Sequence, residues 1–306
     1  MTIAIAGAGA VGKTILETFL EYPQYQSQII ILTRSPKSNS LLDKFKQLQV
    51  DYDDVSATAA QLEKHDVRTV ICTIGLLSQE ASRAQVNLIK SSDQSPTTRR
   101  FIPSEYSLPQ GEEYLDLNYT VQFFLDAVQA LEDSSLQYTR IFPGYFMDYW
   151  AMPKIRTHLE PLVYAVDIAN GKALIPGDGN NIITMTYSYD MAKFVVRLLD
   201  VEEWPKCSYI GGDDITLGQL VRLGEEIRGI DFEIAYDDLN KTGDEKPPRT
   251  LGLIYDDETA EWIDGYTNKL LITGHFELPR DKRLNAIFPD IKPLSMRSLL
   301  TKAWKP

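Results

Sequence analysis

The chain has 306 residues, enough to bury a sizeable core in one large domain or in two closely joined ones. Its 43% hydrophobic and 24% charged residues are ordinary for a soluble globular protein. The net charge of −12 argues against broad binding to nucleic acid or anionic membranes, although a local basic pocket stays compatible with it. No apolar run approaches membrane-spanning length, and the first strand leaves no room for a signal peptide. We therefore expect a cytoplasmic protein.

Residues that build metal or nucleophile sites are sparse. Cys72 and Cys207 have no metal-ligand spacing, and Cys72 lies within an apolar run, as a buried small side chain would. The three histidines are far apart in sequence, and the chain has no Gly-x-Ser-x-Gly nucleophile turn. We expect no metal site.

A glycine motif at the start of the chain gives the strongest signal. Residues 3–6 form a short apolar run that suits a strand buried on both faces. Gly7, Gly9 and Gly12 follow at the Gly-x-Gly-x-x-Gly spacing, and residues 11–22 have apolar side chains at helical intervals. Strand, glycine turn and helix in this order predict a dinucleotide site. The glycines allow a tight turn, approach of a pyrophosphate and close helix packing, while the helix N-terminus attracts the phosphates.

The end of the second predicted strand indicates which dinucleotide binds. Residues 28–33 form this strand, and Arg34, Ser35 and Lys37 follow it where an NAD site usually has an acidic residue for the ribose hydroxyls. A guanidinium and a hydroxyl suit a 2′-phosphate, so we expect NADP(H) as the cofactor. The alternative is a solvated arginine in a polar turn.

Strands and helices alternate through the first half of the chain. Further strands are predicted at residues 50–52, 67–74, 100–103 and 138–142. Helices are predicted at residues 41–48, 56–64, 84–90 and 113–132, with a polar surface loop at 91–98. This alternation requires parallel pairing with right-handed crossovers. It predicts an α/β fold in which residues 1–150 form an NAD(P)-binding Rossmann domain, a doubly wound parallel sheet.

The strict alternation fails beyond Trp150. Strands are predicted at residues 182–186, 209–212 and 232–236, and helices at 189–199, 216–227, 259–268 and 296–304. Thr216 is the expected N-cap of its helix, and residues 237–249 are expected to form a mobile loop. We interpret residues 151–306 as a smaller C-terminal α/β substrate-binding lobe, with some segments returning to the Rossmann sheet.

Several motifs together resemble the NmrA-like and isoflavone-reductase-like group of atypical short-chain dehydrogenases. They are the glycine turn, Leu32-Thr33-Arg34-Ser35, Phe101-Ile102-Pro103-Ser104-Glu105-Tyr106, Phe142-Pro143-Gly144-Tyr145-Phe146-Met147-Asp148-Tyr149, Thr216-Leu217 and Phe288-Pro289-Asp290. The resemblance covers nearly the whole chain and is closest in character to fungal members, many of which act in secondary metabolism. It implies an NADP-binding Rossmann domain, a small substrate domain and, for reductase members, hydride transfer from NADPH to a small aromatic or polyketide-like molecule.

The chain departs from this family at one important position. Catalytic members carry a lysine on the helix after the Pro-Ser-Glu segment, where it binds the cofactor ribose and assists proton transfer. The matching residue here is Asn118, which can hydrogen bond a ribose hydroxyl but carries no charge. Tyr114 precedes it by one helical turn on the same face of the predicted helix, as a candidate proton donor. The alternative is that Tyr114 is an exposed aromatic residue at the helix start.

Ligands of open α/β sheets bind at the carboxyl ends of the strands, and this rule indicates which residues contact the cofactor and the substrate. The residues expected to contact the cofactor are Gly7, Gly9, Ala10, Val11, Gly12, Thr33, Arg34, Ser35, Thr73, Gly75, Ser104, Asn118, Pro143, Gly144 and Tyr145. Those expected to contact the substrate are Tyr106, Phe146, Tyr149 and Trp150. The aromatic run that ends at Trp150 can equally fill a core at a domain junction.

These observations leave three hypotheses of different classes. The first is an NADPH-dependent reductase of a small, mostly apolar metabolite, with Tyr114 and Asn118 in catalysis. The second is a redox-sensing regulator that binds NADP without turnover, which the missing lysine permits. The third is a non-redox enzyme, such as a cyclase or dehydratase. We expect a small-molecule substrate, no nucleic acid or membrane partner, and a monomer or homodimer.

Overall fold

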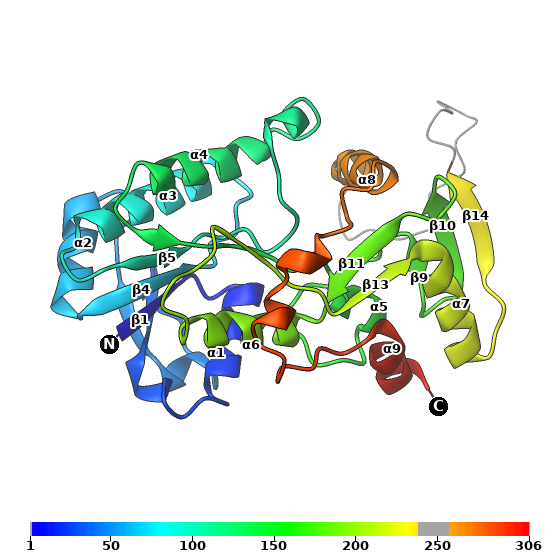
Figure 1. The fold of residues 1–306 in the computed structure, drawn as a ribbon, viewed down its shortest axis with the longest axis horizontal. Coiled ribbons are helices and arrows are strands. Elements are labelled where there is room, and N and C mark those ends of the chain that lie inside the picture. The colour runs from blue at the N-terminus through cyan, green and yellow to red at the C-terminus, as the bar shows by residue number, and fades with distance from the viewer. Residues whose placement is uncertain (1, 238–256, 306) are drawn as a thin grey trace. The chain divides into compact units, whose positions relative to one another are not determined.

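The computed structural model describes residues 2–237 and 257–305, and the chain divides into two units (Figure 1). The first comprises Met1–Phe142 and Ala192–Ser208, and the second comprises Pro143–Met191 and Tyr209–Pro306. The sequence placed the boundary at residue 150; in the structure the first unit ends eight residues earlier, and residues 192–208 return to it. This returning segment includes the larger part of helix α6 (Ser188–Leu198).

The first unit is built on a six-stranded sheet of order β3-β2-β1-β4-β5-β6, in which all pairs are parallel. Its strands are β1 (Thr2–Ala6), β2 (Ile29–Thr33), β3 (Lys46–Gln49), β4 (Val67–Cys72), β5 (Arg100–Ile102) and β6 (Gln137–Tyr138). The helices of this unit besides α6 are α1 (Ala10–Phe19), α2 (Val55–Lys64), α3 (Gln79–Gln94) and α4 (Val121–Glu132), with a short 3₁₀ turn η1 (Gln26–Gln28). The predicted Rossmann-type doubly wound sheet is confirmed.

Both faces of the sheet are covered, which explains why its inner strands β1, β2 and β4 are mostly apolar. One face packs against α2, α3 and α4 through buried residues such as Leu62, Leu88 and Leu131. On the other face Ile3 and Ile5 of β1 are fully buried. Figure 1 shows α2, α3 and α4 on one side of the strands and α1 on the other.

The edge strand β3 corrects two predictions. A helix was predicted over residues 41–48 and a strand over 50–52, but the structure has the 3₁₀ turn η2 (Leu42–Lys44) followed by β3 at Lys46–Gln49. Both predictions were wrong because β3 borders solvent and has no fully buried residue to mark it. The apolar residues that suggested a strand, Val50 and Tyr52, are buried just after β3 ends.

Two helices also differ from their predicted limits. Helix α3 continues to Gln94 through part of the predicted loop at 91–98, because Ser91 and Ser92 are buried with their hydroxyls donating to backbone carbonyls one turn earlier. The single helix predicted over 113–132 is instead a 3₁₀ turn, η3 (Glu112–Tyr114), and then α4. Asn118 Oδ1 accepts from Thr120 N at 2.9 Å and from its hydroxyl, and this local bonding competes with helix formation.

The last strand predicted in the first half is divided in two. Thr139 N bonds to Phe101 O of β5, but Arg140 N bonds to Lys206 O, so the chain changes partner strand at this point. Strand β7 (Arg140–Phe142) therefore pairs with β12 (Cys207–Tyr209) in a separate two-stranded sheet.

The second unit contains two three-stranded sheets of order β14-β10-β9 and β13-β11-β8. Its strands are β8 (Tyr145–Phe146), β9 (Val166–Asp167), β10 (Lys172–Pro176), β11 (Ile182–Thr186), β13 (Asp213–Thr216) and β14 (Glu233–Asp237). Its helices are α5 (Asp148–Ala151), α7 (Leu217–Arg228), α8 (Asp257–Ile272) and α9 (Met296–Trp304), with 3₁₀ turns η5 (Arg280–Lys282) and η6 (Leu284–Ala286). The predicted cap is confirmed, because Thr216 and Gln219 form a reciprocal capping box. The predicted loop at 237–249 lies, beyond Asp237, outside the described residues.

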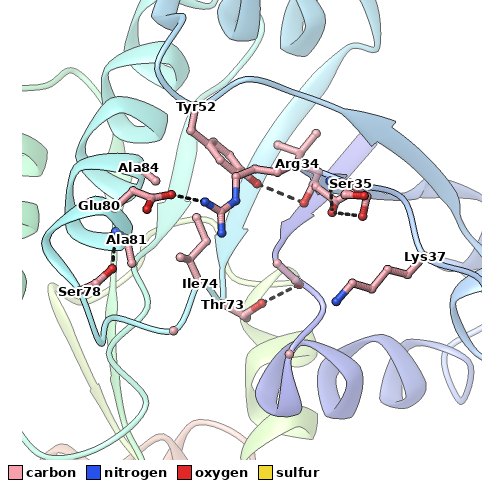
Figure 2. Close-up of a pocket in the computed structure, with 15 residues that line it drawn as sticks. Arg34, Ser35, Lys37, Tyr52, Thr73, Ile74, Ser78, Glu80, Ala81 and Ala84 are labelled. Carbon is pink, nitrogen blue, oxygen red and sulfur yellow. Dashed lines mark hydrogen bonds and ion pairs between the residues drawn. The ribbon is translucent and has the colours of Figure 1, made fainter.

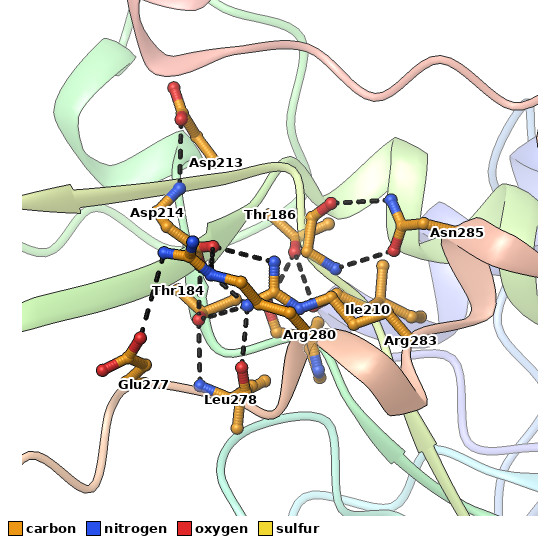
Figure 3. Close-up of polar contacts among 12 residues, drawn as sticks. Thr184, Thr186, Ile210, Asp213, Asp214, Glu277, Leu278, Arg280, Arg283 and Asn285 are labelled. Atoms are coloured by element: carbon orange, nitrogen blue, oxygen red, sulfur yellow. Dashed lines mark hydrogen bonds and ion pairs between the residues drawn. The ribbon is translucent and has the colours of Figure 1, made fainter.

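A cluster of ion pairs joins residues 280–283, which precede α9, to strand β13 (Figure 3). The guanidinium of Arg283 donates to both carboxylate oxygens of Asp214, at 2.9 and 2.8 Å, and to Thr184 Oγ1 at 3.1 Å. Arg280 adds a second cation at 3.0 Å from Asp214. Arg283 and Asp214 are 11% and 13% exposed, so this pair is largely buried in the second unit, whereas the Arg280 side chain is 62% exposed.

Candidate nucleotide-binding site

A pocket of about 470 Å³ opens where β1, β2 and β4 end in the first unit (Figure 2). Its lining residues are Gly7, Gly9, Leu32, Thr33, Arg34, Ser35, Lys37, Tyr52, Thr73, Ile74, Gly75, Ser78, Glu80, Ala81 and Ala84. Much of the predicted cofactor-binding set thus meets in one place, at the carboxyl ends of parallel strands where such folds bind ligands.

The glycine turn has the geometry that a pyrophosphate requires. Gly7 has a φ of +97°, a conformation that favours glycine, and space is open where a Cβ on Gly9 would lie. A Cβ on Gly12 would lie 2.5 Å from Gly7 O, so only glycine allows α1 to pack this closely. Helix α1 begins at Ala10, followed by Val11, and no side chain caps its N-terminus. Its first backbone N–H groups are therefore left for a ligand.

Thr73, at the end of β4, fixes this turn in place. Its hydroxyl lies 3.1 Å from Ala6 O and 2.9 Å from Gly7 O, within hydrogen-bond reach of both carbonyls. Gly75 follows with open space beside its Cα, at the exposed rim of the pocket. Thr73 therefore supports the backbone that faces the pocket, and a contact of its own with the cofactor stays a prediction.

Arg34 and Lys37 give the pocket a basic rim. Arg34 Nη1 forms an ion pair with Glu80 Oε1 of α3. The Lys37 backbone is held by Gln47, which donates to its carbonyl at 2.7 Å and accepts from its N–H at 3.0 Å. Within the described part of the chain, the Lys37 ammonium has no hydrogen-bond or ion-pair partner. Ser35 completes the turn through mutual bonds with Thr33 at 3.0 and 3.2 Å.

Glu80 is the site residue that sequence reasoning missed. An NAD site usually has its acidic residue at the end of the second strand, whereas Glu80 comes from the first turn of α3, 46 residues beyond Arg34 along the chain. The one available signal was Ser78 as an N-cap with an acid two residues later, which predicts a helix start but no contact with Arg34.

The residues that follow β5 form hydrogen bonds with other parts of the first unit. Ser104 N donates to Gln85 Oε1 at 2.7 Å, and the Tyr106 hydroxyl donates to Cys72 O at 2.9 Å. Glu105 is buried and accepts two hydrogen bonds of 2.6 Å from Arg140. Burial raises the pKa of Glu105, against the opposing effect of the Arg140 guanidinium. Contacts of Ser104 with the cofactor and of Tyr106 with substrate stay predictions.

Tyr114 and Asn118 lie in a turn region before α4. Asn118 N donates to Tyr114 O at 2.9 Å, so the two residues are one turn apart, although the continuous helix expected to carry them is absent. Asn118 is buried and its side-chain oxygen is bonded to Thr120. Tyr114 is half-buried, and burial together with the charge of Glu113 raises its pKa. Their catalytic roles stay predictions.

The aromatic run of the second unit both fills a core and lines a cavity. Gly144 has a φ of +71°, and a Cβ there would lie 2.1 Å from Thr184 O, so glycine is required beside β11. The Tyr145 ring packs on Tyr164 at 5.3 Å, within an aromatic core. Tyr149 and Trp150 line a mostly apolar cavity of about 370 Å³, together with Met152, Pro153, Pro161, Leu162, Val163, Val166, Asp167, Ile168, Ala169 and Trp304.

Asp148, inside the same run, has a structural role. It is fully buried and accepts hydrogen bonds from Ser188 N at 2.9 Å, Ser188 Oγ at 2.6 Å and Thr157 Oγ1 at 2.7 Å. Burial raises the pKa of the Asp148 carboxyl, while these hydrogen bonds act to lower it. The neighbouring Pro143 carbonyl accepts a 2.7 Å bond from the Thr186 hydroxyl, and Phe146 is buried. Cofactor contacts of Pro143, Gly144 and Tyr145, and substrate contacts of Phe146, stay predictions.

No group of three or more His, Cys, Asp or Glu side chains among the described residues is arranged to hold a metal ion. None of the described helices combines the length and the apolar character needed to cross a membrane.

Known proteins agree with this architecture. No family model matches the chain. An oxidoreductase, swnN, of Metarhizium robertsii is 26% identical, covering 99% of this chain and 97% of the relative. The oxidoreductase BOA1 of Botryotinia fuckeliana is 27% identical, covering 95% of each. Among solved structures, the NADPH complex of leucoanthocyanidin reductase from Vitis vinifera has a TM-score of 0.73 at 18% identity, covering 99% of each chain. An isoflavone reductase has a TM-score of 0.71 at 18% identity, covering 98% of each.

The structural likeness shows a fold shared with NAD(P)-binding reductases, and the relatives that match along nearly the full length are oxidoreductases. These similarities to fungal oxidoreductases and to the fold of isoflavone reductase agree with the resemblance to the NmrA-like and isoflavone-reductase-like group that the motifs predicted.

Proposed function

We propose that the protein is an NADP(H)-dependent reductase of a small, mostly apolar metabolite. The observation that carries the proposal is the pocket beside the glycine turn, whose rim bears Arg34 and Lys37. Its volume of about 470 Å³ suits part of a nucleotide, since ligand pockets generally span about 300–1,000 Å³. The similar leucoanthocyanidin reductase was solved as a complex with NADPH, which supports the same cofactor here.

The residues of the pocket fit the cofactor's parts. The uncapped start of α1 and the open space at Gly9 suit the pyrophosphate. Arg34, Ser35 and Lys37 would bind the 2′-phosphate, because a guanidinium, a hydroxyl and an ammonium all donate to phosphate oxygens. When bound, NADPH supplies a hydride. The chain would then contribute binding, orientation and exclusion of water.

Tyr114 is our candidate donor of the proton that must accompany the hydride, and Asn118 is our candidate for holding the cofactor ribose or a relay water. A hydroxyl whose pKa is raised above its usual value stays protonated at neutral pH, so Tyr114 is suited to donate rather than to accept. The Asn118 oxygen is bonded to Thr120, which leaves its amide to donate to a ribose hydroxyl. The apolar lining near Tyr149 and Trp150 favours an apolar or aromatic substrate. A role in secondary metabolism is part of this proposal, and it rests on the resemblance of the sequence motifs to fungal members of the group.

One observation favours a second candidate, a regulator that binds NADP without turnover. The position of the family's catalytic lysine holds Asn118, an uncharged residue with its oxygen already bonded inside a turn. Such a residue cannot stabilise a developing negative charge as an ammonium does.

Two measurements on the purified protein separate these outcomes. Calorimetric titration with NADPH tests the binding site, and absence of binding by any nicotinamide nucleotide would refute both candidates. Stopped-flow oxidation of bound NADPH against a panel of aromatic ketones and benzylic ethers then tests turnover. Oxidation that depends on one compound class supports the reductase, whereas tight binding with no oxidation across the panel supports the regulator.

A further inference from the structure

The nucleotide pocket contains an acidic side chain opposite its basic rim. Glu80 lies in the first turn of α3, after the N-cap Ser78, where the helix dipole stabilises a carboxylate. Its carboxylate is paired with the Arg34 guanidinium across the pocket, as Figure 2 shows. The side chains are 63% and 69% exposed, so an incoming ligand can reach both.

This ion pair bears directly on the choice between the two nicotinamide cofactors, which differ only in the 2′-phosphate. A phosphate that binds Arg34 competes with the Glu80 carboxylate, which already occupies Nη1 of the guanidinium, and lies close to its negative charge. By contrast, a carboxylate beside the ribose can accept hydrogen bonds from the hydroxyls of the unphosphorylated cofactor. In NAD sites that role belongs to an acid at the end of the second strand, where this chain has Arg34.

We propose that Glu80 sets the cofactor specificity of this site. It competes with the 2′-phosphate for Arg34 and binds the ribose hydroxyls of NAD(H), so that the protein accepts both cofactors with a limited preference for NADP(H). Lys37, whose ammonium is unpaired within the described residues, maintains that preference. This inference rests on the proposed function, because it assigns the pocket to the adenosine half of the cofactor.

The test uses 2′,5′-ADP and 5′-AMP, which differ by the 2′-phosphate alone and undergo no redox reaction. Each is titrated by calorimetry into the wild-type chain and into Glu80→Gln. We expect Glu80→Gln to bind 2′,5′-ADP about threefold to tenfold more tightly, because the competing ion pair and the like charge are both removed. We expect its affinity for 5′-AMP to fall by about twofold to fivefold, as one exposed hydrogen-bond acceptor is lost.

Two further variants show whether Glu80 acts through Arg34. In Arg34→Ala/Glu80→Gln, measured against Arg34→Ala, the gain for 2′,5′-ADP should shrink to about twofold or less. The matched control is Asp53→Asn, which removes another exposed ion pair held by α3, that of Arg83 with Asp53 at 3.0 Å, outside the pocket. Its affinities should equal those of the wild type.

The outcomes of this experiment are distinguishable from a failure of the proposed function. A wild-type chain that binds neither nucleotide refutes the proposed function itself. A wild-type chain that binds both, with an unchanged ratio of affinities in Glu80→Gln, overturns the role of Glu80 alone. An equal change in Asp53→Asn would also overturn it, since the effect would then come from the charge or stability of α3.

Discussion

Arg34→Ala is the substitution whose effect on cofactor binding can be worked out most directly. A charge-assisted hydrogen bond to the 2′-phosphate contributes about 1.5–3 kcal/mol. Displacing the exposed pair between Arg34 and Glu80 costs up to about 1 kcal/mol. Taken at the middle of both ranges, the net loss in the variant should be about 1.75 kcal/mol, or a roughly twentyfold weaker affinity for NADPH. The affinity for NADH should change by about twofold at most, because NADH lacks the 2′-phosphate.

Calorimetric titration of both cofactors into the wild type and the variant measures this difference. Arg83→Ala is the matched control, since it removes another exposed arginine whose ion pair lies outside the pocket. Equal losses of NADPH and NADH affinity in Arg34→Ala would show that the substitution disturbs the pocket generally. An unchanged NADPH affinity in a folded variant would refute the assignment of Arg34 to the 2′-phosphate.

Three other predictions test the chemistry and the fold. Tyr114→Phe should lower single-turnover oxidation of NADPH by about 10²–10⁴-fold with unchanged NADPH affinity, and full activity would remove Tyr114 from the mechanism. Gly144→Ala should lower the free energy of unfolding by about 2 kcal/mol or more in urea denaturation, because it adds a backbone clash to an unfavourable φ. Gly229→Ala is the control, since Gly229 has a φ of +66° but open space around it, and it should cost clearly less. Equal costs would contradict the clash. Burial acts to raise the pKa of Asp214, but hydrogen bonds and charges from Arg283 and Arg280 lower it overall. The ion pair therefore stabilises the fold above pH ~4, and this stabilisation is lost as the pH falls below that value. Asp214→Asn should therefore cost about 1–3 kcal/mol at pH 7 and less at pH 3. Glu226→Gln, which removes an exposed ion pair, should cost clearly less, and a pH-independent cost of Asp214→Asn would refute the linkage.

The parts of the candidate site that could be predicted from the sequence are those formed by residues close together in the chain. The turn from Gly7 to Gly12 needs only a buried strand before it and a helix after it, and both are legible as apolar patterns. Arg34 was located in the same way, because it follows the last residue of a strongly apolar strand. Neither inference required knowledge of which distant segments meet.

Errors arose where long-range contacts or side-chain bonds decide the local structure. Strand β3 forms because Lys46 pairs with Ile30 of β2, not because of its own composition. Glu80 reaches Arg34 only because the parallel crossover brings the start of α3 to the end of β2. The break before α4 follows from the bonds between Asn118 and Thr120, which a hydrophobic pattern does not register.

That break also limits what Asn118 can do. Its backbone N–H still bonds to Tyr114 O at 2.9 Å, so the one-turn spacing expected between the two residues persists without the helix. Because its side-chain oxygen is bonded to Thr120, the group that remains is an amide donor, which suits a ribose hydroxyl and cannot supply or accept a catalytic proton. Glu105 is no substitute, since both its oxygens are bonded to Arg140. If the protein turns over NADPH, the hydroxyl of Tyr114 is therefore the better candidate for the proton donor than Asn118 or Glu105, with water as the alternative.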